Sequence, residues 1–135
     1  MNEGAVATKR RVLLVDDDPL LLDVLTTVLD LEEFDVVAAS DGDTALELAS
    51  REDLDLVVCD VSMPGTDGLE VCRRIKADAT TEDLPVILLT ARDTEEGQRA
   101  GEAAGCDAYV TKPFSPLELL EILRSQPVRR RAEGT

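Results

Sequence analysis

The chain has 135 residues with 14 basic and 29 acidic side chains, a formal net charge of −15, and no histidine. This length is enough for one domain with its own hydrophobic core. An acidic domain repels phosphate backbones, so direct binding of nucleic acid is not expected. Without histidine the chain cannot form a Ser-His or Cys-His nucleophile pair or a His-based metal site. If the chain exchanges phosphate with a phosphohistidine, that histidine must belong to a partner.

Cellular location is predicted from the cysteines and from the absence of long apolar runs. Cys59, Cys72 and Cys106 are an odd number without a C-x-x-C pair, which predicts free thiols in a reducing compartment. Residues 1–9 lack the apolar stretch of a signal peptide, and no run approaches the roughly 18 apolar residues of a membrane span. The sequence therefore predicts a cytoplasmic protein with no membrane contact.

Two kinds of segment alternate along the chain. Short apolar runs rich in β-branched residues predict five strands, at Val12–Val15, Phe34–Ala39, Leu56–Cys59, Val86–Leu89 and Ala108–Val110. Apolar residues at helical spacing predict five helices. The first begins after the Asp18 cap, with Pro19 as its first residue, and the others extend over Thr44–Ser50, Asp67–Ala77, Thr94–Ala104 and Pro116–Leu123. Continuously apolar strands are buried on both faces, as in a parallel sheet covered by helices. The alternation predicts an α/β fold, but periodicity leaves the strand order open.

The alternating pattern also sets the expected domain limits. Residues 11–124 are expected to form the domain. Residues 1–10 are expected to be a flexible N-terminus, and residues 125–135 a basic tail or the start of a linker.

Polar residues follow four of the predicted strands, at the edge where doubly wound sheets bind ligands. Asp16-Asp17-Asp18 follow the first strand, Asp60 the third, Thr90 the fourth and Lys112 the fifth. Asp18 is explained most simply as a helix N-cap. Asp16, Asp17 and Asp60 would repel one another unless a cation, a proton or a lysine compensated their charge. Oxygen ligands favour Mg²⁺ over zinc at such a site.

Thr90 and Lys112 each have a purely structural alternative. Thr90 could be an ordinary capping hydroxyl, and Lys112 could be a surface lysine that extends from a strand end into solvent. Four chemically matched strand ends at one edge are difficult to explain as coincidence. We therefore interpret them as one site.

Four motifs in this order resemble the receiver domain of bacterial two-component response regulators, of the chemotaxis-regulator type, from about Arg11 to Leu123. They are Val15-Asp16-Asp17-Asp18-Pro19, Asp60-x-x-Met63-Pro64-x-x-Asp67-Gly68, Leu84-Pro85-Val86-Ile87-x-x-Thr90-Ala91 and Tyr109-x-x-Lys112-Pro113-Phe114. The resemblance implies a flavodoxin-like (βα)5 fold. Its parallel sheet has the order 2-1-3-4-5 and carries helices on both faces.

The resemblance also implies a role for each site residue. Asp60 would be the phosphoryl acceptor, with Thr90 and Lys112 bound to phosphoryl oxygens. Thr90 and Tyr109 would form a switch pair, and the Lys112-Pro113 peptide would be cis. Mg²⁺ would be held by Asp16, Asp17, Asp60 and the backbone carbonyl of Ser62.

The leading functional hypothesis is a phosphorylatable switch rather than an enzyme. A histidine kinase or histidine phosphotransfer protein would donate to Asp60 in a Mg²⁺-dependent phosphorelay. The modified surface would then act on a downstream effector protein or domain, or form a phosphorylation-dependent homodimer. One alternative is a haloacid-dehalogenase-type aspartyl-phosphate hydrolase, but that family has an Asp-x-Asp nucleophile on its first strand. Another is a receiver-shaped scaffold that is never phosphorylated.

Overall fold

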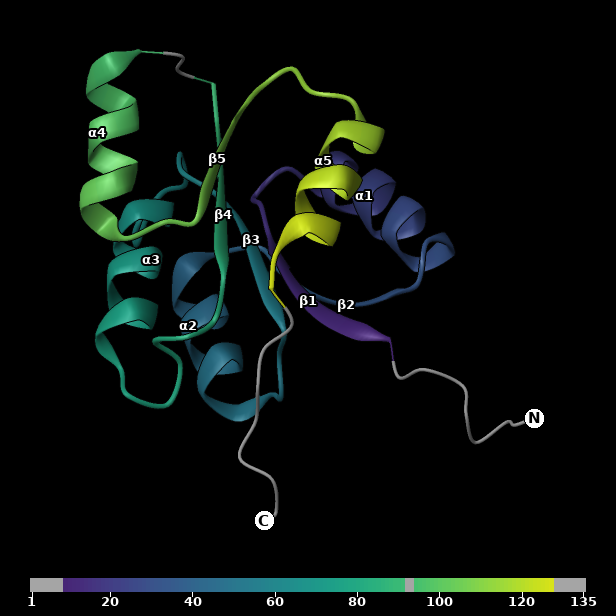
Figure 1. The fold of residues 1–135 in the computed structure, drawn as a ribbon, viewed down its shortest axis with the longest axis horizontal. Coiled ribbons are helices and arrows are strands. Elements are labelled where there is room, and N and C mark those ends of the chain that lie inside the picture. The colour runs from purple at the N-terminus through teal and green to yellow at the C-terminus, as the bar shows by residue number, and fades with distance from the viewer. Residues whose placement is uncertain (1–8, 92–93, 128–135) are drawn as a thin grey trace.

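Five strands and five helices alternate in the computed structural model, which describes residues 9–91 and 94–127 (Figure 1). The strands are β1 (Arg10–Val15), β2 (Phe34–Ala39), β3 (Leu56–Asp60), β4 (Val86–Thr90) and β5 (Ala108–Thr111). The helices are α1 (Pro19–Leu31), α2 (Gly42–Arg51), α3 (Gly68–Ala77), α4 (Glu95–Ala104) and α5 (Pro116–Ser125). All ten predicted elements are confirmed. The expectations for residues 1–8 and 128–135 lie outside the described residues.

All neighbouring strands pair in parallel, in the order β2-β1-β3-β4-β5. The predicted flavodoxin-like order is thus confirmed. Because β1 lies between β2 and β3, the ends of β1 and β3 are neighbours, with Val15 opposite Cys59. The same edge contains the end of β4 beside that of β5, with Thr90 opposite Thr111.

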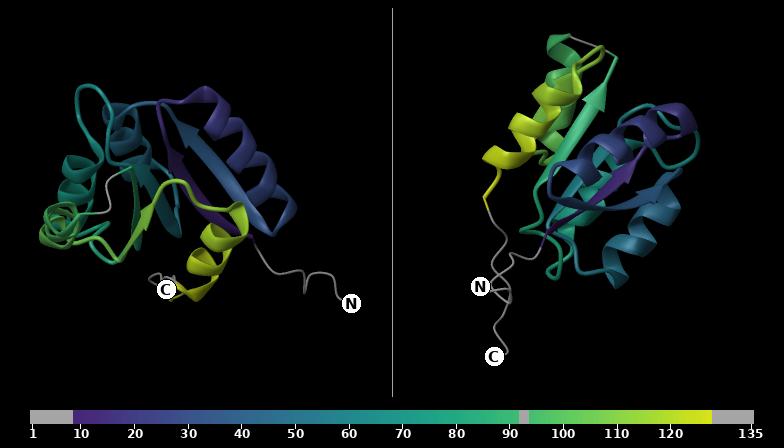
Figure 2. Two further views of the ribbon diagram at one scale, coloured as in Figure 1. Left: turned by 90° about the horizontal axis from the view of Figure 1, so that it is seen from above. Right: turned by 90° about the vertical axis from the view of Figure 1, so that its right-hand side faces the viewer.

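The sheet separates two hydrophobic cores because successive side chains of a strand point to opposite faces. Leu13 and Val15 of β1 join the core under α2, α3 and α4. Val12 and Leu14 join the core under α1 and α5. Figure 1 shows these two groups of helices on the left and right of the sheet, and Figure 2 shows the same layers from two other sides.

Each helix begins at a side-chain cap near the carboxyl edge of the sheet. Asp18 accepts from the Leu20 N–H at 3.0 Å, as predicted. The other helices begin in the same way, after Asp41, Asp67, Thr94 and Ser115. Caps of this kind satisfy backbone donors that a helix leaves unpaired. They fix where each loop at this edge ends.

No helix in the described part of the chain is long and apolar enough to cross a membrane. The cysteines are free, with Cys59 and Cys72 buried and Cys106 partly buried.

Candidate functional site

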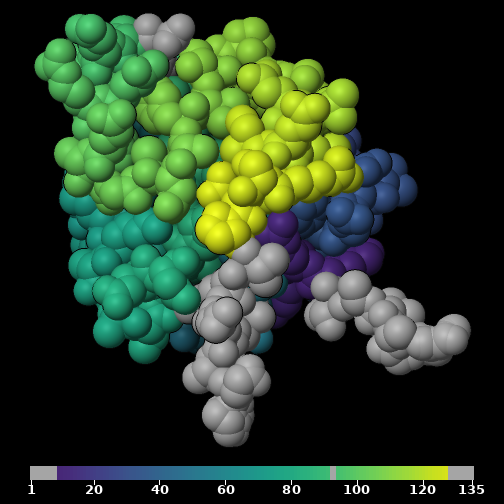
Figure 3. Space-filling model, viewed as in Figure 1, coloured from purple at the N-terminus to yellow at the C-terminus, as the bar shows by residue number. Residues whose placement is uncertain are grey.

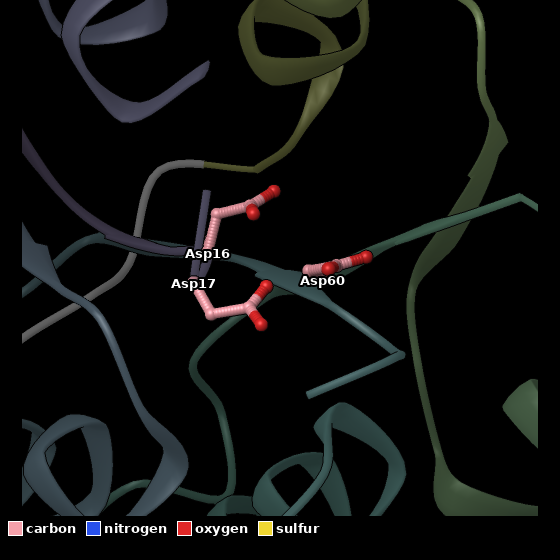
Figure 4. A group of neighbouring side chains, drawn as sticks. All are labelled: Asp16, Asp17 and Asp60. Carbon is pink, nitrogen blue, oxygen red and sulfur yellow. The ribbon is translucent and has the colours of Figure 1, made fainter. Parts of the chain in front are cut away.

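Three carboxylates from two neighbouring strands meet at the carboxyl edge of the sheet. Asp16 and Asp17 follow β1, and Asp60 is the last residue of β3. Carboxylate oxygens of all three lie within 4.8 Å of one another. Figure 4 shows the three side chains extending to the same side of the two strand ends. The strand order therefore brings Asp60 close to Asp16 and Asp17, which precede it by 44 and 43 positions in the sequence.

The three carboxylates differ in exposure. Asp16 and Asp60 are 1% and 5% exposed, whereas Asp17 is exposed. The Asp16 carboxylate also accepts a hydrogen bond from the Asp18 N–H at 2.9 Å, which holds it in place. The cluster is thus buried at the strand ends and open to solvent beside Asp17.

Lys112 supplies a positive charge to the two buried acids. Its Nζ lies 3.2 Å from Asp60 Oδ1 and 3.4 Å from Asp16 Oδ2. Its backbone N–H donates to the Thr90 carbonyl at 2.7 Å, and the Lys112-Pro113 peptide is cis, as the resemblance implied. Lys112 is therefore directed at the acids and does not extend into solvent.

Burial and charge together perturb the ionisation of the cluster. Burial raises the pKa of Asp60. The negative charges of Asp16 and Asp17 raise the pKa of Asp60 further, and the positive charge of Lys112 only partly offsets these effects. Burial by itself would lower the pKa of Lys112, but Asp16 and Asp60 raise it above its ordinary value. One ammonium faces three carboxylates, so the site has an excess of negative charge.

The donor set of the cluster fits a magnesium ion. Three carboxylates offer hard oxygen ligands within one small volume, and Asp17 leaves one side open for water and substrate oxygens. Mg²⁺ prefers such sites, whereas zinc favours nitrogen and sulfur ligands.

Thr90 and Tyr109 lie on the adjacent strands β4 and β5. Thr90 ends β4 and is 3% exposed, and Tyr109 on β5 is partly buried opposite Leu88. The N-cap of α4 is Thr94, so Thr90 is not that cap. Both switch candidates line one open cavity of about 680 Å³, together with Ser62, Met63, Gly97 and Ala100.

The loop between β3 and α3, residues 61–67, contains Ser62 and is fixed at both ends. Val61 donates its N–H to Leu89 of β4 at 2.8 Å and accepts from the Gly68 N–H at 3.0 Å. Met63 is 7% exposed and packs into the core below, while Ser62 is exposed. In the sequence, Gly68 stands out only as part of the motif Asp60-x-x-Met63-Pro64-x-x-Asp67-Gly68. Its position against the end of β3 could not be derived from the sequence.

The chain belongs to the response regulator receiver domain family, whose family model matches residues 12–124. Solved structures of response regulators and their receiver domains are similar to this chain. The chemotaxis protein CheY4 of Vibrio cholerae is 29% identical with a TM-score of 0.82, over 86% of this chain and 97% of that one. A putative response regulator from Chloroflexus aurantiacus is 34% identical with a TM-score of 0.82, over 86% and 95% of the chains.

A third similar structure is the receiver domain of a sensor histidine kinase from Pseudomonas aeruginosa, with a magnesium ion coordinated in its active-site cleft. It is 31% identical with a TM-score of 0.80, over 86% of this chain and 95% of that one. The protein is thus a receiver domain of two-component signalling, a family of phosphoacceptors in which phosphorelay and Mg²⁺ binding are characteristic. This family membership excludes the haloacid-dehalogenase alternative.

Proposed function

We propose that the domain accepts a phosphoryl group on Asp60 from the phosphohistidine of a histidine kinase or histidine phosphotransfer protein. The observation that carries this proposal is the position of Asp60. Its carboxylate is buried at a strand end, 3.2 Å from the Lys112 ammonium and within 4.8 Å of the Asp16 and Asp17 carboxylates. The histidine must come from the partner because this chain has none.

In this reaction an Asp60 carboxylate oxygen forms a bond to phosphorus while the phosphorus–nitrogen bond of the donor breaks. The electron pair of that bond leaves with the partner's imidazole. Phosphoryl transfer depends mainly on alignment and on neutralising charge. Lys112 would pair with one phosphoryl oxygen, and the Thr90 hydroxyl would donate to another.

Asp16, Asp17, Asp60 and the Ser62 carbonyl would hold Mg²⁺, which when bound supplies positive charge to the phosphoryl oxygens. The magnesium ion in the Pseudomonas receiver domain supports this assignment. The excess negative charge at the cluster supports it independently.

Phosphorylation of Asp60 would change the surface of the domain through movements of Thr90 and Tyr109. A phosphoryl oxygen would attract the Thr90 hydroxyl toward Asp60, and the Tyr109 ring would move into the cavity that both residues line. Tyr109 lies next to α4, because a methyl group added at Gly101 would be 3.0 Å from its ring. Figure 3 shows α4 and α5 on one face of the molecule. The altered face would then bind an effector protein or domain, or a second copy of the chain.

The domain would work in the cytoplasm as a phosphoacceptor without turnover of its own, bound neither to membrane nor to nucleic acid.

The proposal is tested by incubating the protein with acetyl phosphate and Mg²⁺ and measuring intact mass. We expect one phosphoryl adduct on wild type, none without Mg²⁺, and none on Asp60→Asn. Mass is the appropriate readout because the chain has no tryptophan to report by fluorescence. Normal uptake by Asp60→Asn would refute the acceptor assignment. A wild-type protein that takes up no phosphoryl group would support the scaffold alternative.

A further inference from the structure

Gly68 places the first turn of α3 directly against the residue that bears the proposed acceptor. It is the first residue of the helix after the Asp67 cap, and it is buried. A methyl group added at Gly68 would overlap the Asp60 carbonyl oxygen and lie 2.8 Å from Val61 Cα. Both are backbone atoms, so no side-chain rotation can relieve the contact.

Backbone conformation does not account for this glycine. Among the described glycines, only Gly65 and Gly105 have positive φ, 78° and 92°. Gly68 is therefore needed for space rather than for φ. A close approach of two backbone segments is the remaining structural use of glycine.

A second glycine contact acts on the other end of the same loop. Gly42, the first residue of α2, would with a methyl group overlap the Thr66 carbonyl oxygen and lie 2.9 Å from Thr66 Cβ. The Thr66 hydroxyl donates to the Asp43 carboxylate at 2.8 Å, which adds a polar contact at this point. The loop of residues 61–67 is thus held by α3 at one end and by α2 at the other.

From these two contacts we infer that Gly68 and Gly42 are positioning residues for phosphoryl transfer, and that they set the location of the Asp60 carboxylate and the Ser62 carbonyl. This inference rests on the proposed function. Asp16 and Asp17 follow β1 and Lys112 follows β5, so none of them belongs to the segment that Gly68 and Gly42 contact. A methyl group at either glycine therefore changes the spacing within the cluster.

The test compares Gly68→Ala with wild type in two measurements on folded protein. Mg²⁺ affinity is measured by calorimetry with the metal alone, and phosphoryl uptake is measured as the rate at saturating Mg²⁺ and acetyl phosphate. Misplacement by about 1 Å can reduce a reaction rate about 100-fold. We expect a Mg²⁺ dissociation constant raised at least about tenfold and a saturated rate lowered by about 10- to 100-fold.

Gly105→Ala is the matched control. Gly105 caps α4 at φ 92°, and an added methyl group would meet only the Lys76 side chain, at 3.2 Å or more. Alanine there strains the backbone and lowers stability without touching the β3–α3 loop. Its Mg²⁺ affinity and its saturated rate should equal those of wild type. This control separates lost stability from lost alignment.

Gly42→Ala provides a second variant if Gly68→Ala does not fold, and it should change both quantities in the same direction. Wild-type Mg²⁺ affinity and rate in a folded variant of either glycine would overturn the inference, as would loss of the fold in both. A wild type that binds Mg²⁺ but takes up no phosphoryl group would contradict the proposed function instead. The inference about the two glycines would then be tested by the Mg²⁺ affinities of the variants, without the uptake rates.

Discussion

Asp17 is the exposed member of a carboxylate cluster whose charge one lysine cannot balance. Without metal the excess charge opposes folding, so Asp17→Asn should raise the melting temperature in EDTA. Mg²⁺ at ten times its dissociation constant should stabilise wild type by about 1.4 kcal/mol, or about 3–6 °C. Asp17→Asn should remove this rise.

Thermal unfolding followed by circular dichroism, in EDTA and in Mg²⁺, measures both effects. Asp23→Asn is the matched control, because Asp23 is an exposed acid on α1 outside the cluster. It should keep the full response to Mg²⁺. If Asp17→Asn kept that response too, the metal would bind elsewhere.

Asp60 makes stability depend on pH in the metal-free protein. Burial, with Asp16 and Asp17, raises the pKa of Asp60 above its ordinary 3.8. The folded state therefore binds this proton more tightly than the unfolded state, and that stabilisation is lost as pH rises through the folded pKa. In EDTA, the stability of Asp60→Asn relative to wild type should grow as pH rises from 3.8 and then level off. Urea unfolding at a series of pH values measures the difference, and a flat or falling difference would contradict the account.

At the scale of elements, Lys76 links the end of α3 to the start of β4 and the turn before β5. Its Nζ donates to the Leu84 carbonyl at 2.9 Å and to Asp107 at 2.7 Å, and Asp107 also accepts from the Val86 N–H at 2.8 Å. Lys76→Met should lower the free energy of unfolding by about 1–2 kcal/mol, because the ammonium is mostly buried while Asp107 is partly solvated.

The matched control is Arg99→Met. The Arg99–Glu95 pair is 3.4 Å long, with side chains 75% and 88% exposed. Exposed pairs of this kind contribute little, so its loss should change stability by less than about 0.5 kcal/mol. Urea unfolding compares the two variants. Equal effects would mean that Lys76 does not join these elements.

The packing of α4 on β5 can be tested through Gly101. Gly97 and Gly101 each lower the helix propensity of α4, which predicts a mobile helix. The structure shows in addition that a methyl group at Gly101 would lie 3.0 Å from the Tyr109 ring and 3.3 Å from Cys106 Sγ. The helix propensity gained by Gly101→Ala, about 1 kcal/mol, should therefore be offset by crowding against Tyr109.

A double-mutant cycle with Tyr109→Ala measures this crowding. Gly101→Ala should stabilise the protein more when the ring is absent, with a coupling of at least about 0.5 kcal/mol. Additive effects in urea unfolding would show that the ring and the glycine are independent.

Local signals in the sequence predicted all ten helices and strands. The Asp18-Pro19 cap and the five apolar runs can be recognised from residues that are neighbours in the sequence. The structure contains the cap and the five strands, and the strand ends differ from the predicted ends by a few residues at most. Asp60 and Thr90 are the last residues of their strands rather than the first of the loops. The closeness of Gly68 to Asp60 depends on how α3 packs, which no local pattern contains.

At the scale of the whole molecule, the site depends on strand order. Lys112 and Asp16 are 96 positions apart and meet only because β1, β3, β4 and β5 lie in that order. Apolar periodicity could not predict the order, because β1, β3 and β4 are buried on both faces and look alike. The resemblance provided the order. The residues at the strand ends were predicted from position alone.

Asp60, rather than another acid of the cluster, should take up the phosphoryl group. After reaction with acetyl phosphate and Mg²⁺, hydroxylamine converts an acyl phosphate to a hydroxamate that peptide mass spectrometry can locate. We expect a hydroxamate on Asp60 and unmodified Asp16 and Asp17. A hydroxamate on Asp16 or Asp17, with Asp60 unmodified, would contradict this expectation.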